Sequence, residues 1–200
     1  MIDRARVVLA LALGITLPST VRAQSAQPVS VQLSVLGTAI DNGPTNIGGI
    51  GVEPQVRFNW LKSATRGVIS VGVGGQWTRH TSGPDAITIT GVFLEPRWVF
   101  PVNSERFAPY GALRLGLLQQ ASSIDLGRVG TWEGNSWGSA VGGGGGFVVR
   151  ITPKVNFDVG GAIVRQQFGE LNLPQNLGTI YGNGFLTYAV KAGFTVGLGG

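Results

Sequence analysis

The chain has 200 residues, of which 43% are hydrophobic and only 12% are charged, and its mean hydropathy is positive. This length favours one domain, and the absence of an apolar run of about 18 residues beyond the N-terminus excludes a membrane-spanning helix there. With no cysteine, a net charge of only +5 and no basic helix, the sequence supports neither a disulfide or thiolate site nor nucleic-acid binding.

The first 23 residues have the pattern of a secretory signal peptide. Arg4 and Arg6 give a positive start, the stretch from Val7 to Leu17 is apolar, and Val21-Arg22-Ala23 resembles a cleavage site with small residues. The apolar stretch is too short for the alternative, an N-terminal anchor helix. We therefore predict a signal peptide over residues 1–23 and a mature domain over residues 24–200, with a net charge of +3.

Most of the mature chain alternates between apolar and polar residues with a period of two. One example is the segment in which Val52, Val56 and Phe58 share one face while Glu53 and Arg57 share the other. This period is typical of strands, and the 33 glycines spread through these segments are unfavourable to helices. The predicted strands, in chain order, are Val29 to Ile40, Ile47 to Trp60, Gly67 to His80, Ile87 to Phe100, Phe107 to Gln119, Ser136 to Ile151, Val155 to Phe168 and Ile180 to Leu198.

The predicted connections alternate between two sets. Those of the first set are short and contain Pro, Asn, Ser or Lys; they are Leu61 to Arg66, Pro101 to Arg106 and Thr152-Pro153-Lys154. The second set contains two longer segments, Gln120 to Asn135 and Gly169 to Thr179. Long strands joined by alternating short turns and longer loops indicate an all-β fold, an eight-stranded antiparallel up-and-down transmembrane barrel with its short turns in the periplasm.

Aromatic residues gather near both ends of the predicted strands. Amphipathic rings prefer the two membrane interfaces, so these positions predict two aromatic girdles. The girdle residues are Trp60, Trp77, Trp98, Phe100, Tyr110, Trp137, Phe168 and Tyr181.

Two stretches carry a resemblance to a known family. Glu53-Pro54 within its strand is echoed by Glu95-Pro96, and Gly142 to Arg165 reads as a glycine-rich strand, a Thr-Pro-Lys turn and an alternating strand. The mature chain thereby resembles the outer-membrane β-barrel family of OmpA- and OmpX-type proteins. The resemblance implies an outer-membrane location, structural, adhesive or narrow-pore roles, and the lipid bilayer and the barrel-assembly machinery as partners.

The polar faces of the strands carry eight charged residues that would point into the lumen of such a barrel. They are Glu53, Arg57, Glu95, Arg97, Arg114, Arg150, Asp158 and Lys191. Because a lumen of eight strands is filled by side chains, we expect ion pairs there. The expected pairs join either glutamate to Arg57, Arg97 or Arg114, and Asp158 to Arg150 or Lys191. A packed ionic core is the main interpretation, and the alternative is a narrow channel that favours anions.

Other functions have weaker support in the sequence. His80, near Ser82 and Asp85, is similar to a His-x-Ser pair of the lipid A deacylase family, but the strand context of that motif is missing, so we expect no enzyme. The glycines from Gly142 to Gly146 lack the Lys-Ser or Lys-Thr of a phosphate loop. No metal site or cofactor is predicted. A soluble lipocalin-like carrier, with its apolar face inward, is a further alternative. The sequence thus favours a non-catalytic structural or surface-interaction protein.

Overall fold

The computed structural model describes residues 27–41, 46–63, 66–104, 106–125, 127–172, 179–180 and 184–198. The predicted signal peptide lies outside these residues. Eight long strands make up most of the described chain, each built on the alternating pattern of the sequence. They are β1 (Val29–Asp41), β2 (Asn46–Ser63), β3 (Gly67–Ser82), β4 (Asp85–Val99), β5 (Phe107–Asp125), β6 (Thr131–Arg150), β7 (Val155–Phe168) and β10 (Phe185–Leu198).

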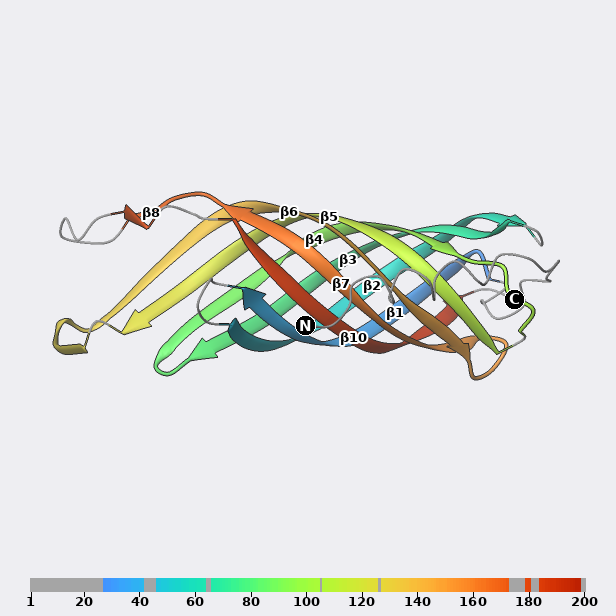
Figure 1. Ribbon diagram of the computed structural model, residues 1–200, viewed down its shortest axis with the longest axis horizontal. Helices are drawn as coiled ribbons and strands as arrows, with labels where there is room; N and C mark the ends of the chain where they lie inside the picture. Colours follow the sequence, from blue (N-terminus) through green and yellow to red (C-terminus); the bar gives the residue numbers. More distant parts are fainter. Residues whose placement is uncertain are drawn as a thin grey trace, which may run out of the picture.

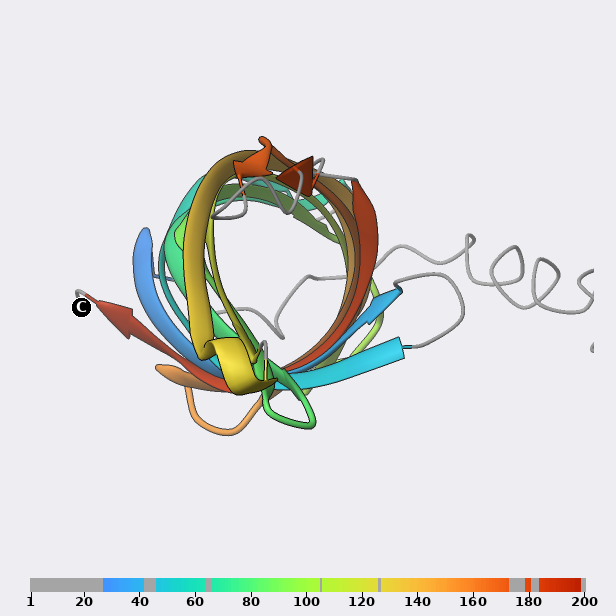
Figure 2. The same ribbon diagram turned by 90° about the vertical axis from the view of Figure 1, so that its left-hand side faces the viewer.

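The eight strands form a closed antiparallel barrel. Their order around the ring is β1-β10-β7-β6-β5-β4-β3-β2, so each strand pairs with its neighbours along the chain. The ring closes between the first and last strands, in a register that runs from Val29 opposite Leu198 to Asp41 opposite Leu186. The strands are strongly tilted along the barrel in Figure 1, and the end view in Figure 2 shows the closed ring. The predicted fold class is confirmed.

The strand boundaries differ from the prediction mainly at one end of the barrel. β5 and β6 continue as a hairpin beyond the predicted strand ends, with Asp125 opposite Thr131, so most of the predicted loop from Gln120 to Asn135 is wrong. A 3-10 turn, η1 (Gly127–Val129), follows β5. The predicted last strand is also too long: Thr179–Ile180 (β9) pairs with Leu171–Asn172 (β8) in a separate ribbon, and β10 begins at Phe185. Figure 1 shows the β5–β6 hairpin and β8 at its left-hand side.

The barrel has an apolar outer surface and a polar inner surface. On β1, Leu33 and Val35 are more than 60% exposed, whereas the intervening Gln32 and Ser34 are buried. The same alternation continues around the ring, with Leu113, Leu117 and other large apolar side chains outside. The lipocalin-like alternative is therefore wrong, because it requires the apolar side chains to point inward.

Two local features adapt the long strands. Between β2 and β3 the register shifts at a bulge, which leaves Trp60 as the extra residue, 83% exposed at the barrel end. The pairing of β2 with β3 has a gap around Pro54, and the pairing of β4 with β5 has one around Pro96. Proline has no N–H to donate, so the proline of each Glu-Pro pair accounts for the gap at its position.

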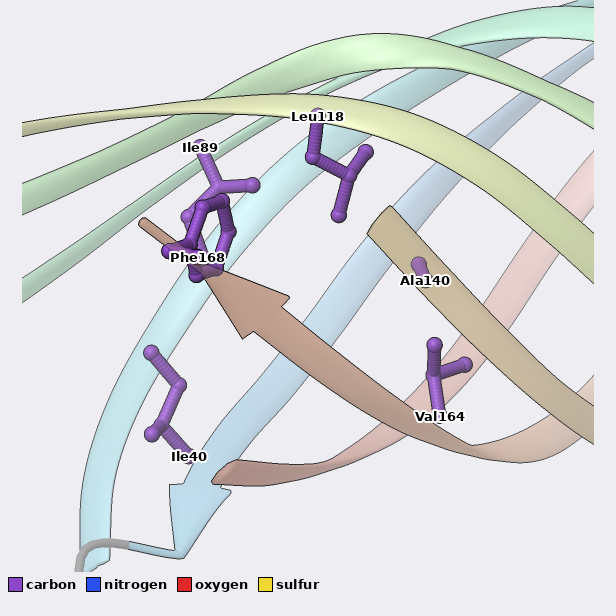
Figure 3. Packing of buried hydrophobic residues seen from close by; sticks show 6 residues of the cluster. All are labelled: Ile40, Ile89, Leu118, Ala140, Val164 and Phe168. Atoms are coloured by element: carbon purple, nitrogen blue, oxygen red, sulfur yellow. The ribbon is translucent and has the colours of Figure 1, made fainter. Parts of the chain in front are cut away.

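The interior is layered along the barrel. Near the short turns, Val68, Val99, Ala108, Tyr110 and Val148 form one buried cluster. Toward the other end a second cluster contains Ile40, Ile89, Leu118, Ala140, Val164 and Phe168, whose side chains project into the barrel in Figure 3. Along β4, Glu95 and Arg97 lie between Ile89 of the second cluster and Val99 of the first. A charged layer is thus held between two apolar layers.

Candidate functional site

Strand parity brings seven of the eight predicted interior charges into one layer of the lumen. Residues two or four apart on a strand share a face, which places Glu53 with Arg57 on β2 and Glu95 with Arg97 on β4. Arg114 comes from β5, Asp158 from β7 and Lys191 from β10. The side chains of Lys191 and Arg114 are 9% exposed, and the other five are less exposed still. We call these seven residues the lumen network.

Glu95 lies at the centre of the lumen network. Its Oε1 accepts from Nη2 of Arg57 at 2.8 Å and from Nη2 of Arg97 at 3.1 Å. Its Oε2 accepts from Nη2 of Arg114 at 2.6 Å and from Nζ of Lys191 at 3.1 Å. One carboxylate therefore joins cations from four strands, β2, β4, β5 and β10.

Glu53 repeats part of this arrangement from β2. It lies 2.7 Å from Nη1 of Arg114 and 3.2 Å from Nζ of Lys191, so both cations bridge the two glutamates. Arg114 directs a separate guanidinium nitrogen to each carboxylate, whereas Lys191 contacts both carboxylates with its single Nζ. The echoed Glu-Pro sequence thus supplies two matching carboxylates, and the pairing predicted between the glutamates and Arg57, Arg97 or Arg114 has its counterpart in these contacts.

Asp158 pairs with Arg97, not with Arg150 or Lys191 as predicted. Arg150 lies at the end of β6, where its backbone N–H donates to the carbonyl of Arg106, and is half-buried there. The prediction relied on proximity along neighbouring strands, whereas the contact from Arg97 on β4 to β7 crosses the lumen.

Tyr110 belongs to this interior and was wrongly predicted as a girdle residue. Its hydroxyl donates to Oδ1 of Asp158 at 2.9 Å, and the guanidinium of Arg97 lies 3.8 Å from the centre of its ring. Similarly, the guanidinium of Arg114 lies 4.0 Å from the ring centre of Phe93. Tyr110 is four residues from Arg114 on β5, so both side chains lie on the inward face of the strand. This spacing is a better guide to the direction of Tyr110 than its position near a strand end, which suggested the girdle.

The other predicted girdle residues also lie inside or outside the barrel according to which face of the strand they occupy. Phe168 has the parity of Asp158 on β7 and is buried in the second apolar cluster, so its assignment to the girdle is also wrong. The exposed fractions of Trp60, Trp77, Trp98 and Trp137 lie between 41% and 83%, which places these rings on the outer surface. Phe100 is partly buried and packs against Trp98 with ring centroids 4.7 Å apart. Tyr181 lies outside the described residues.

The glycine run of β6 makes room for the tyrosine. Tyr110 lies opposite Gly146 of β6, which in turn lies opposite Gly160 of β7. A Cβ at Gly160 would collide with the hydroxyl of Tyr110 and lie 2.8 Å from the carbonyl of Gly145. The glycines therefore allow the Tyr110 side chain to reach across β6 to Asp158.

Two small cavities adjoin the lumen network. A cavity of about 10 Å³ adjoins Arg57, Arg97 and Asn156, and another of about 10 Å³ adjoins Arg114 and Lys191. Each volume corresponds to roughly one water molecule. The described residues contain no group of three or more His, Asp or Glu side chains that could hold a metal ion.

His80 is built into the wall of the lumen. It is 1% exposed, and its Nε2 lies 2.8 Å from the hydroxyl of Thr38. Ser82 is exposed at the end of β3, and Oδ1 of Asp85 accepts from the backbone N–H of Asp125 at 2.9 Å. The three residues weighed as hydrolase candidates thus have separate surroundings.

In the part of the chain that the structure describes, no helix has the length and apolar character required to cross a bilayer.

Comparison with solved structures gives the same architecture. Neisserial surface protein A is similar over 88% of this chain and 100% of its own, with 18% identity and a TM-score of 0.65. The N-terminal barrel domain of Pseudomonas aeruginosa OprF is 14% identical over 84% of this chain and 98% of its own, with a TM-score of 0.48. Yersinia pestis Ail is 15% identical over 84% of this chain and 97% of its own, also with a TM-score of 0.48. No family model and no curated protein sequence matches this chain.

These observations define the class of the protein. A closed barrel that satisfies its backbone hydrogen bonds, with an apolar exterior and a polar interior, is a membrane-spanning structure. The chain has the fold of the eight-stranded outer-membrane β-barrels, and its apolar outer surface is the surface that faces lipid.

Proposed function

We propose that this protein is a non-catalytic outer-membrane barrel with a structural or surface-interaction role. In this proposal the filled barrel is a rigid membrane anchor, and the extended hairpins at the end opposite the short turns are the parts offered to the cell exterior. The observation that carries it is the packing of the lumen: seven ion-paired side chains lie between two apolar layers, and the two cavities that adjoin them measure about 10 Å³ each.

The filled lumen supports an anchor over the alternative of a narrow anion-favouring channel. Conduction requires a path along the axis and binding weak enough for ions to leave again. Here the cationic groups of Arg57, Arg97, Arg114 and Lys191 are each engaged by a carboxylate, and apolar side chains lie above and below them.

Conductance separates the two functions. The folded protein, reconstituted in planar bilayers in 1 M KCl, is expected to give no steady ohmic current. Unheated gel migration of the same sample, compared with a heated sample, verifies that the barrel is folded. Reproducible steps that favour chloride would overturn the anchor in favour of the channel.

The absence of catalysis is tested separately with lipid. Purified folded protein incubated with lipopolysaccharide is expected to release no fatty acid. Release that disappears in a His80→Ala variant, with folding retained, would contradict the non-catalytic proposal. The burial of His80 against Thr38 is what favours the negative result.

A further inference from the structure

The charges outside the lumen are unequally distributed between the two barrel ends. At the end with the short turns, Lys62, Arg66, Arg106 and Lys154 are exposed, and we call these four residues the periplasmic rim. No acidic residue lies there among the residues that the structure describes; Glu105, beside Arg106 in the sequence, is outside them. At the opposite end the described charges are mostly acidic: Asp41, Asp85, Asp125, Glu133 and Glu170, against Arg79, Arg128 and Arg165.

The rim is continuous across neighbouring turns. The backbone N–H of Arg150 donates to the carbonyl of Arg106 at 2.7 Å, which joins the end of β6 to the turn before β5. The carbonyl of Lys154 accepts from the N–H of Gly197 on β10 at 2.8 Å. Like charges held on connected turns repel one another, and nearby anions offset this repulsion.

The rim also lies at the level where lipid headgroups meet the apolar band. Nε1 of Trp98, on the outer surface, donates to the carbonyl of Arg66 at 2.8 Å. Phe107, 42% exposed, directly follows Arg106, and Trp60 precedes Lys62 by two residues. Exposed aromatic rings occupy the membrane interface, so the adjoining cations lie among headgroups.

From these three observations we propose that the periplasmic rim binds the anionic headgroups of phospholipids in the periplasmic leaflet. The recognised chemistry is a phosphodiester that carries a net negative charge, as in phosphatidylglycerol, since a zwitterionic headgroup offers no net charge to the rim. A soluble anionic polymer of the periplasm is less favoured, because the rim residues adjoin outward, lipid-facing rings. This inference goes beyond the anchoring role and rests on a barrel that spans the membrane with its short turns on the periplasmic side.

Lipid retention measured by native mass spectrometry tests the proposal. The folded protein is released from micelles that contain equal amounts of dioleoylphosphatidylglycerol and dioleoylphosphatidylcholine, and bound lipids are counted by mass. The test variant combines Arg66→Gln, Arg106→Gln and Lys154→Gln. The matched control removes three cations from the opposite end through Arg79→Gln, Arg128→Gln and Arg165→Gln.

The native protein is expected to retain phosphatidylglycerol in preference to phosphatidylcholine. Each basic residue near an anionic surface contributes roughly five-fold to the affinity, so the rim variant should lose about 100-fold of this preference. The control should keep it. Raising the salt to 1 M, where the Debye length is about 3 Å, should abolish the preference of the native protein.

Three results would overturn the proposal: no preference in the native protein, an equal loss in the control, or rim-dependent sedimentation with peptidoglycan sacculi while lipid retention is unchanged. Heat-modifiable gel migration verifies that every variant is folded. Failure of the proposed anchor function would appear in the planar-bilayer experiment as a steady conductance, and it would leave the lipid retention unchanged. If the triple variant does not fold, each single replacement should still lower the preference by roughly five-fold.

Discussion

Replacing Glu95 with glutamine tests the lumen network at its centre. The substitution keeps the size of the side chain but removes the carboxylate shared by Arg57, Arg97, Arg114 and Lys191. Arg97 retains Asp158, while Arg114 and Lys191 retain Glu53. Arg57, 2% exposed, keeps only the neutral oxygens of Gln55 at 2.8 Å and Ser70 at 3.3 Å as described partners. An uncompensated buried charge costs about 3–5 kcal/mol, which is the expected loss in the free energy of unfolding.

Glu53→Gln is the matched control. It removes an equally buried carboxylate, but Arg114 and Lys191 both keep Glu95, so the expected loss is about 1.5–3 kcal/mol, that of hydrogen bonds to charged groups. Urea unfolding in phosphatidylcholine vesicles, followed by tryptophan fluorescence and by unheated gel migration, measures both variants.

A double-mutant cycle isolates the effect of leaving the Arg57 charge without a carboxylate partner. Adding Arg57→Gln to Glu95→Gln should recover part of the lost stability, with a coupling energy between 0.5 and about 3 kcal/mol. Equal losses in Glu95→Gln and Glu53→Gln, together with zero coupling to Arg57, would refute the reasoning.

Three further changes test the packing and the orientation of the strands. Gly160→Ala should lower the free energy of unfolding by about 1–3 kcal/mol because its Cβ collides with Tyr110, whereas Gly75→Ala, whose nearest neighbour is 3.6 Å away, should be nearly neutral in the same urea titration. Tyr110→Phe should cost about 1–3 kcal/mol, since the buried Asp158 carboxylate loses a donor; an unchanged urea midpoint would contradict this. Leu33→Arg, at an outward position that is 61% exposed, should cost about 2–4 kcal/mol in lipid vesicles, and a neutral effect would place that face away from the acyl chains.

The sequence predicted the fold well because one face of nearly every strand meets lipid. Along a strand such as β1, that requirement forces apolar residues at alternate positions, and the polar faces then place Glu53, Glu95 and Arg114 in the lumen without further information. The β5–β6 hairpin was missed for the complementary reason. From Gln119 to Asp125 polar residues lie on both faces of the strand, so the alternation is lost, although the backbone pairing with β6 continues to Asp125.

Side-chain partners were harder to predict than side-chain directions. Parity alone would have placed Tyr110 and Phe168 inside, but their positions near strand ends favoured the girdle. The pairing of Asp158 with Arg97 depends on which residues face each other across the lumen. That depends on strand tilt and stagger, which the period of two does not contain.

The contact between Tyr110 and Asp158 also explains how a glycine-rich strand keeps its register. Gly-rich strands specify their pairing weakly, because they have few side chains to distinguish one alignment from the next. In β6, Gly144 and Gly146 face inward with no side chain, yet Tyr110 on β5 reaches over this strand to Asp158 on β7, which also binds Arg97 on β4. A slip of one residue in β7 would turn Asp158 toward lipid and leave Arg97 with Glu95 alone. The lumen network therefore supplies, across the barrel, the alignment that β6 itself does not specify.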